Sequence, residues 1–231
     1  MKRQNVNDNA HTAETGQALT DTKDYSQKLV EASRYLAAHD SRLAKIIAAS
    51  PACDFAPHTD YYGALVNSII GQQLSVKAAA AIKKRFRELF GSENYPPPEA
   101  ILEKSTEDLR AVGLSFAKIK YIRDLAEHVL DGRITFKNLT GQTNQEIIAE
   151  LTDVKGIGEW TVHMFLMFCV GRLDVLPTGD LGVRNAVRNI YGFQDAPSPA
   201  QVQEIAAKNN WHPYETVASW YLWRSLDNAP L

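Results

Sequence analysis

Asp180 is the carboxylate with the most suggestive chemical setting in this chain of 231 residues. It follows the turn-forming segment Pro177-Thr178-Gly179 and precedes a helical pattern at 181–191. An aspartate there can cap the helix, and the helix dipole stabilises its negative charge. An ionised carboxylate can also stabilise a cationic transition state and orient or deprotonate an attacking water. The local sequence leaves capping and chemistry both open, and they are compatible.

A glycine-rich hairpin precedes this carboxylate. Gly156 and Gly158 flank Ile157 between two helical patterns, 144–151 and 159–170. Glycine permits positive φ angles, and Ile157 can anchor the turn in a core. The N–H groups at the start of the second helix would then form an anion site. The alternative is a tight helix–helix turn with a glycine cap.

The elements that would position these residues are helical. Apolar residues recur at helical spacing from Tyr25 onward, and Ser75, Ser115 and Ser198 precede helical runs as caps. No segment alternates with period two. The pattern predicts an all-α protein. Residues 1–22 are polar and without periodicity, so we expect a disordered tail there.

Composition narrows the function classes. Hydrophobic residues make up 45% and charged residues 23%, as in ordinary globular proteins. Cys53 and Cys169 are too few and too far apart for a disulfide framework or a four-cysteine metal site. We expect no secretory signal, because the N-terminus has no apolar segment, and no membrane span.

Charge gives only local hints of a polyanionic partner. The net charge is -2, so the chain as a whole is not basic. Two stretches are locally basic, and their side chains could form a nucleic-acid face or only a solvated surface. They contain Lys77, Lys83, Lys84, Arg85 and Arg87, and then Lys118, Lys120 and Arg123.

Four motifs in sequence order resemble those of the helix-hairpin-helix (HhH-GPD) superfamily of DNA glycosylases, in particular the DNA-3-methyladenine glycosylase II and yeast-type alkylpurine enzymes. The hairpin V-K-G-I-G-E-W-T-V begins at Val154. The other three are a wedge-type loop, a segment with an aspartate and a closing helix, at 69–75, 176–184 and 220–224.

The resemblance implies a two-lobed helical fold with an active-site cleft between the lobes. Residues 59–170 would form a central helical bundle that contains the helix-hairpin-helix motif at 151–170. Residues 23–58 would supply N-terminal helices packed with a C-terminal lobe, 171–231, which carries the catalytic aspartate.

The resemblance also implies an activity. Asp180 would be the catalytic carboxylate of a monofunctional glycosylase that excises 3-methyladenine and 7-methylguanine after base flipping. Related enzymes that also nick the strand use a lysine nucleophile, and Trp160 stands at that position here. Lys155, in the nearby hairpin, would face phosphate or solvent. The partner would be double-stranded DNA with alkylated bases, and we expect a monomer that requires no cofactor.

The base pocket implied by the resemblance has four walls: Trp160, Met164, Leu181 and Trp223. An alkylated purine is cationic, and tryptophan faces attract cations. Met164 and Leu181 replace tyrosines of the bacterial enzyme, which puts a broad substrate range in doubt. The tryptophans could instead be core, and we expect that role for Trp220.

DNA contacts follow from the same resemblance. Gln73 would be the wedge and Leu74 an adjacent apolar plug, although both could simply follow the end of a helix. The expected phosphate contacts are Gly156, Gly158, Thr161, Ser115 and Lys118. Main-chain carbonyls of Thr152, Val154 and Gly156 would hold a structural Na⁺ or K⁺.

Two other functions remain open. One is a helix-hairpin-helix glycosylase for deaminated or otherwise damaged bases, and the other is a non-catalytic DNA-binding module. The second leaves Asp180 and the tryptophans without a task. An enzyme of this kind works where the genome is, in the cytoplasm (nucleoid) of a bacterium or in a eukaryotic nucleus.

Overall fold

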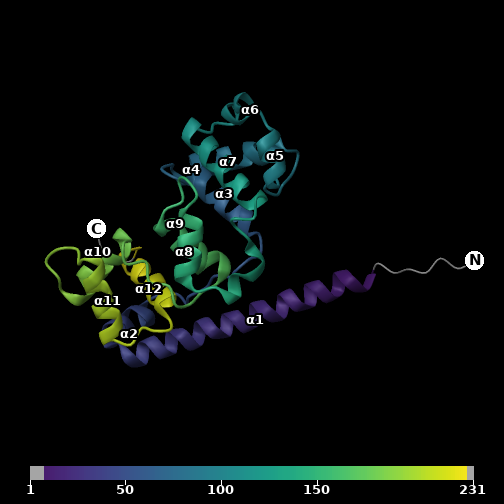
Figure 1. Ribbon diagram of the computed structural model, residues 1–231. Helices are drawn as coiled ribbons and strands as arrows, with labels where there is room; N and C mark the ends of the chain where they lie inside the picture. The colour runs from purple at the N-terminus through teal and green to yellow at the C-terminus, as the bar shows by residue number, and fades with distance from the viewer. Residues whose placement is uncertain (1–7, 228–231) are drawn as a thin grey trace, which may run out of the picture. The chain divides into compact units, whose positions relative to one another are not determined.

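The computed structural model describes the backbone of residues 8–227 and the side chains of residues 24–227. No strand occurs in this part of the chain, so the all-α prediction is confirmed (Figure 1). The elements in chain order are α1 (Asp8–His39), α2 (Ser41–Ala49), α3 (Tyr61–Gly71), α4 (Val76–Leu89), α5 (Pro98–Glu103), α6 (Thr106–Ala111), α7 (Phe116–Leu130), the 3-10 helix η1 (Phe136–Gly141), α8 (Asn144–Thr152), α9 (Glu159–Phe165), the π-helical turn η2 (Leu166–Val170), α10 (Leu181–Tyr191), α11 (Pro199–Lys208) and α12 (Glu215–Asp227).

Two compact units make up the chain. Unit 1 joins the chain up to Ala56 with the chain from Leu173 onward, and unit 2 is Pro57–Arg172. The core of unit 1 brings the N-terminal helices against α10 and α12, because apolar residues at helical spacing line one face of each. Its largest buried side chains include Leu29, Leu36, Leu43, Trp211 and Tyr221.

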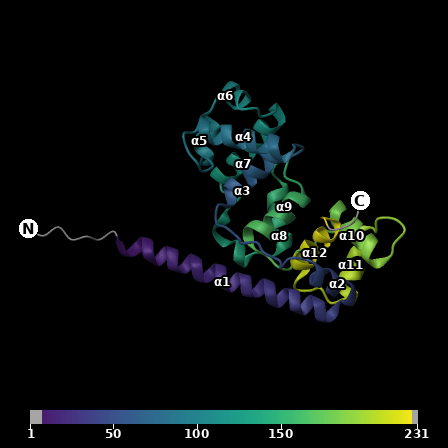
Figure 2. The same ribbon diagram turned by 180° about the vertical axis from the view of Figure 1, so that it is seen from behind.

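Unit 2 is built around α7. This helix packs against α3 and α5, as both views show (Figures 1 and 2). The apolar residues Leu65, Ile69 and Ile70 of α3 are fully buried, as are Ile122 and Leu125 of α7. Helices α8 and α9 also pack against each other and are joined by the glycine turn. Residues 153–158 form this turn and are called the hairpin.

Serine caps place the starts of several helices where the sequence predicts them. The hydroxyl oxygens of Ser75, Ser115 and Ser198 each accept a hydrogen bond from the main-chain N–H three residues later, at 3.3, 3.2 and 3.3 Å. Such caps satisfy one of the N–H groups that a helix start leaves unpaired. The start of α4, directly after the expected wedge loop, is thereby fixed.

The first helix corrects one expectation. Residues 8–22 belong to α1, where the sequence predicts a disordered tail; the rest of that tail, residues 1–7, lies outside the described residues. The segment contains no proline, and its alanines, glutamate and glutamine favour helix even without apolar periodicity.

Among the described helices, none combines the length and the apolarity needed to cross a membrane.

Candidate active site

Asp180 occupies the N-cap of α10 in unit 1. Its main-chain N–H donates to the Pro177 carbonyl at 2.9 Å, which closes the preceding turn. Its Oδ1 accepts a bond from the N–H of Val183 at 2.8 Å and another from Nε1 of Trp223, also at 2.8 Å. Two donors from different helices therefore fix the orientation of this carboxylate.

The contact between α10 and α12 leaves no room for a side chain at Gly182. A Cβ there would lie 2.9 Å from Cδ1 of Trp223 and 3.0 Å from Oδ1 of Asp180. The absence of a side chain at Gly182 is what allows the indole to reach the carboxylate.

The two C-terminal tryptophans differ in what they contact. Both are half-buried against the core of unit 1, so Trp220 packs on the core, as the sequence predicts, while part of its surface stays exposed. The Arg224 guanidinium lies 4.9 Å from the ring centre of Trp220, whereas Trp223 reaches Asp180. Leu181, the first residue of α10, is 61% exposed. Unit 1 thus brings Asp180 and Trp223 into contact and leaves Leu181, the residue after Asp180, at the surface.

The hairpin in unit 2 has the geometry that its glycines predict. Gly156 has φ +83°, and a Cβ there would lie 2.1 Å from Cδ2 of Tyr121, so the backbone lies directly on this ring. Ile157 is buried, as expected of an anchor. Gly158 is the N-cap of α9 and provides no side-chain cap, which leaves the helix start open to an anion.

The residues at the start of α9 point in different directions. Trp160 is 52% exposed, but the Thr161 side chain is buried. Only the main chain of Thr161 is therefore placed to meet the phosphate that the sequence predicts for it. Glu159, in the first turn, is exposed and lies 3.7 Å from Nε2 of His163.

Met164 lines a cavity of about 190 Å³ within unit 2. The cavity has apolar walls and a few polar groups, the usual composition of a small-molecule site. Its lining residues are His58, Ala64, Leu65, Ser68, Thr161, Met164, Phe165, Phe168 and Cys169. Burial raises the pKa of the Cys169 thiol to about 12, which disfavours its reactive thiolate form.

The predicted wedge residues lie on an exposed loop, Gly71–Ser75, which we call the wedge loop. Gln73 has φ +56°, a left-handed conformation that is uncommon outside glycine. Its side chain is exposed, and Leu74 is 37% exposed. Gln72 turns the other way, and its Nε2 donates to the Gly156 carbonyl of the hairpin at 2.8 Å.

Lys118 has partners that the sequence does not predict. Its Nζ donates to the carbonyls of Ile70 and Gln72 at 2.8 and 2.7 Å, where α3 ends and the wedge loop begins. Burial, together with the nearby charge of Lys83, lowers the pKa of Lys118. The ammonium of Lys118, which the sequence predicts to contact phosphate, thus binds protein carbonyls. Ser115, the other residue expected there, caps α7.

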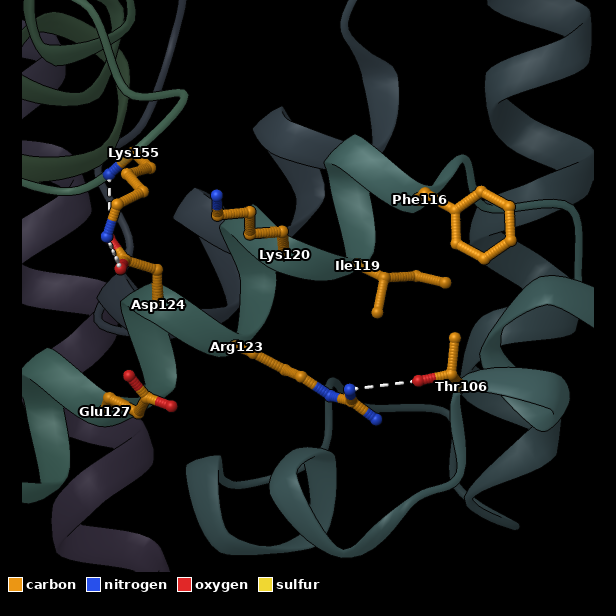
Figure 3. A pocket seen from close by; sticks show the side chains of 8 residues that line it. All are labelled: Thr106, Phe116, Ile119, Lys120, Arg123, Asp124, Glu127 and Lys155. Carbon is orange, nitrogen blue, oxygen red and sulfur yellow. Dashed lines mark hydrogen bonds and ion pairs between the residues drawn. The ribbon is translucent and has the colours of Figure 1, made fainter.

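Lys155 is tied to the protein as well. Its main-chain N–H and its Nζ donate to the two carboxylate oxygens of Asp124 at 2.8 and 2.6 Å (Figure 3). The sequence predicts a lysine that faces phosphate or solvent; the side chain is 57% exposed, and its ammonium is also bound by the protein itself. The hydrogen bond to Asp124 raises the pKa of Lys155.

The carbonyls expected to hold a monovalent cation accept hydrogen bonds here. That of Val154 accepts the N–H of Ile157 at 3.1 Å, and that of Gly156 accepts Gln72. A carbonyl oxygen has two lone pairs, and these bonds use one on each. The second lone pair on each oxygen can therefore bind a cation, and neutral carbonyl oxygens are suitable ligands for one.

Several site residues are missed by sequence reasoning. Gln72, Tyr121 and Asp124 contact the hairpin across 84, 35 and 31 positions. One signal was available: Lys118, Tyr121, Asp124 and His128 recur every three or four residues, which places them on one face of α7.

Comparisons with known proteins agree on one family. Residues 66–211 match the HhH-GPD family, described as a superfamily of base excision DNA repair proteins. DNA-3-methyladenine glycosylase 1 of Schizosaccharomyces pombe is 38% identical over 168 residues, which cover 71% of this chain and 72% of that protein.

Two solved structures resemble the chain throughout most of its length. A DNA-3-methyladenine glycosidase from Bacillus halodurans has a TM-score of 0.77 and 40% identity, covering 85% of this chain and 89% of that one. The S. pombe 3-methyladenine DNA glycosylase Mag1, in complex with abasic DNA, has a TM-score of 0.71 and 33% identity, covering 86% and 98%. With its hairpin, its capping aspartate and these matches, the chain belongs to the HhH-GPD superfamily of base excision DNA repair proteins.

Proposed function

We propose that this protein excises alkylated purines, namely 3-methyladenine and 7-methylguanine, from double-stranded DNA by hydrolysing the N-glycosidic bond. The observation that carries the proposal is Asp180, held at the N-terminus of α10 by bonds from Val183 and Trp223. The names of the relatives support the substrate class, since several are DNA-3-methyladenine glycosylases.

The chemistry requires little beyond a well-placed carboxylate. Alkylation at N3 or N7 makes the purine cationic, so the base departs readily as a neutral group while positive charge builds on the sugar. Asp180 stabilises that charge and orients or deprotonates the water that attacks C1′. No cofactor takes part in these steps, and the protein acts as a monomer.

DNA binding and base extrusion are tasks of unit 2. The open start of α9 and the glycine hairpin bind a phosphate through main-chain N–H groups. Carbonyls of Thr152, Val154 and Gly156 would hold a Na⁺ or K⁺, whose positive charge would favour the binding of phosphate. The exposed Gln73 fills the gap that the extruded base leaves and hydrogen-bonds the orphaned partner, with Leu74 as its apolar neighbour.

Aromatic and soft apolar side chains receive the cationic base. Trp160 offers an exposed aromatic face, and Met164 opens onto a cavity with a thioether that adapts to shape. Trp223 and Leu181 contribute from unit 1.

The test is incubation of the protein with methylated genomic DNA, followed by chromatography of the released bases. We expect free 3-methyladenine and 7-methylguanine, in the presence of a chelator as well as without it. Asp180→Asn keeps the cap and the bond to Trp223, so it should bind the same DNA and release at least about 100-fold less base. No release by the wild type would overturn the proposal.

Two other outcomes point to the other functions. Release of hypoxanthine alone from a deaminated substrate would assign a different damaged base to the same site. Equal behaviour of the wild type and Asp180→Asn in every assay would indicate a DNA-binding module.

A further inference from the structure

One face of α7 carries a row of polar side chains that touch the two loops expected to meet DNA. Lys118, Tyr121, Asp124 and His128 stand three or four residues apart, so they lie above one another on the helix. Asp124 and His128 are buried, and Lys118 and Tyr121 are half-buried. A row of this length and burial is unusual for a solvated helix face.

The C-terminal part of this row supports the hairpin. The ring of Tyr121 packs on Gly156 so closely that no Cβ fits, and Asp124 binds the backbone and the ammonium of Lys155 (Figure 3). His128 Nε2 lies 3.1 Å from Oδ2 of Asp153, at the end of α8. The hairpin is thus fixed to α7 at three successive positions.

The N-terminal end of the row supports the wedge loop. Lys118 binds the carbonyls of Ile70 and Gln72, one on each side of Gly71. These bonds satisfy carbonyls that the end of a helix leaves unpaired, and a cation is favoured there by the helix dipole. The next residue is Gln73, whose left-handed backbone has to be held by its surroundings.

Gln72 links the wedge loop to the hairpin. Its main-chain carbonyl accepts Lys118, while its side-chain amide donates to the Gly156 carbonyl at 2.8 Å. A shift of the hairpin would therefore be transmitted through the side chain of Gln72 to the backbone next to Gln73.

We propose that Lys118 and Gln72 are positioning residues that hold Gln73 in its inserting conformation and couple it to the hairpin's contact with the DNA backbone. This inference rests on the proposed function, because it assigns a task to the wedge loop in base extrusion. It places the ammonium of Lys118 in the protein's own framework and not on a phosphate.

The experiment compares Lys118→Met with Lys120→Met, which removes the same charge from an exposed position of the same helix. Lys118→Arg is the conservative variant, because its guanidinium can still donate to both carbonyls. The probe is a duplex with a stable abasic analogue and 2-aminopurine opposite it, whose fluorescence reports insertion at the gap without any excision. Single-turnover excision from methylated DNA at saturating protein is measured in parallel.

We expect Lys118→Met to lose most of the fluorescence change and to slow single-turnover excision about 10-fold more than the charge control does, because a displaced group near the reaction is costly. Its affinity for undamaged duplex and the salt dependence of that affinity should match those of Lys120→Met. Lys118→Arg should restore both signals.

The inference is overturned if Lys118→Met equals Lys120→Met in fluorescence and rate, or if it loses only affinity and salt dependence, as a direct phosphate contact would. If Lys118→Met does not fold, Gln72→Met carries the same test, since it removes the amide donor from a half-buried side chain. A wild type that shows the fluorescence change but releases no base would refute the proposed function and leave the positioning role intact.

Discussion

The indole N–H of Trp223 donates a hydrogen bond to Oδ1 of Asp180 at 2.8 Å, across 43 residues of sequence. The same oxygen caps α10 through Val183, so a structural bond and a bond from α12 converge on one carboxylate atom. The sequence predicts Trp223 only as an aromatic wall. Its second role is to set the direction in which the carboxylate points.

Trp223→Phe separates these two roles. Phenylalanine keeps an aromatic face but removes the N–H donor, so the carboxylate should lose one of the bonds that orient it. We expect single-turnover excision to fall about 10-fold, which corresponds to the loss of one hydrogen bond to a charged group, with little change in the free energy of unfolding. Equal rates for the variant and the wild type would show that the bond from Trp223 does not orient Asp180.

Lys155 should not form a Schiff base with DNA. Its ammonium is bound by Asp124, whose hydrogen bond raises its pKa, and a protonated amine has no electron pair with which to attack the sugar. By resemblance in sequence, Trp160 stands where strand-nicking enzymes of this superfamily would carry their lysine. Borohydride added during excision of methylated DNA should therefore trap no covalent complex. A trapped complex that disappears in Lys155→Met would contradict this argument and identify the nucleophile.

The local features of the molecule were predictable from the sequence. Serine caps, a glycine with a positive φ and a buried Ile157 between two glycines depend on a few neighbouring residues, and the structure has them where the pattern places them. The cap role of Asp180 belongs to this group, because it needs only the turn before it and the helix after it.

The partners of charged side chains were not predictable in the same way. Lys118 and Lys155 are read from sequence as candidates for phosphate or solvent, but each finds an acceptor at least 31 positions away. Packing of α7 against α3 and the hairpin brings these acceptors within reach. The half-buried ammonium of Lys118 then donates to protein oxygens, because leaving it unpaired would cost its desolvation.

The hairpin glycines should differ sharply in tolerance to alanine. Gly156→Ala requires both a positive φ and a Cβ 2.1 Å from the Tyr121 ring, so we expect it to lower the free energy of unfolding by about 2 to 4 kcal/mol. Gly158 has φ -99°, and no atom lies within 4 Å of a Cβ built there. Gly158→Ala is therefore the matched control and should cost at most about 1 kcal/mol.

Urea denaturation of both variants measures the difference. Adding Tyr121→Ala to Gly156→Ala should relieve the clash but not the backbone strain, so the double variant should be less destabilised than the sum of the single changes. Equal stabilities of Gly156→Ala and Gly158→Ala would contradict the close packing of the hairpin on α7.

His163 gives the protein a pH dependence near neutrality. Burial in α9 lowers its pKa below the ordinary value of 6.5, and the opposing effect of Glu159 is smaller. In the interval just below pH 6.5 the unfolded chain therefore binds more protons at this residue than the folded chain does. The linkage relation then requires the free energy of unfolding to rise with pH through this interval and to fall as pH drops toward the folded-state pKa.

His163→Gln removes the titrating group. The free energy of unfolding of this variant, measured by urea denaturation between about pH 5 and 7, should therefore change less with pH than that of the wild type. The slope is the decisive quantity, because replacing a buried side chain also changes the level; identical slopes would exclude His163 as the source.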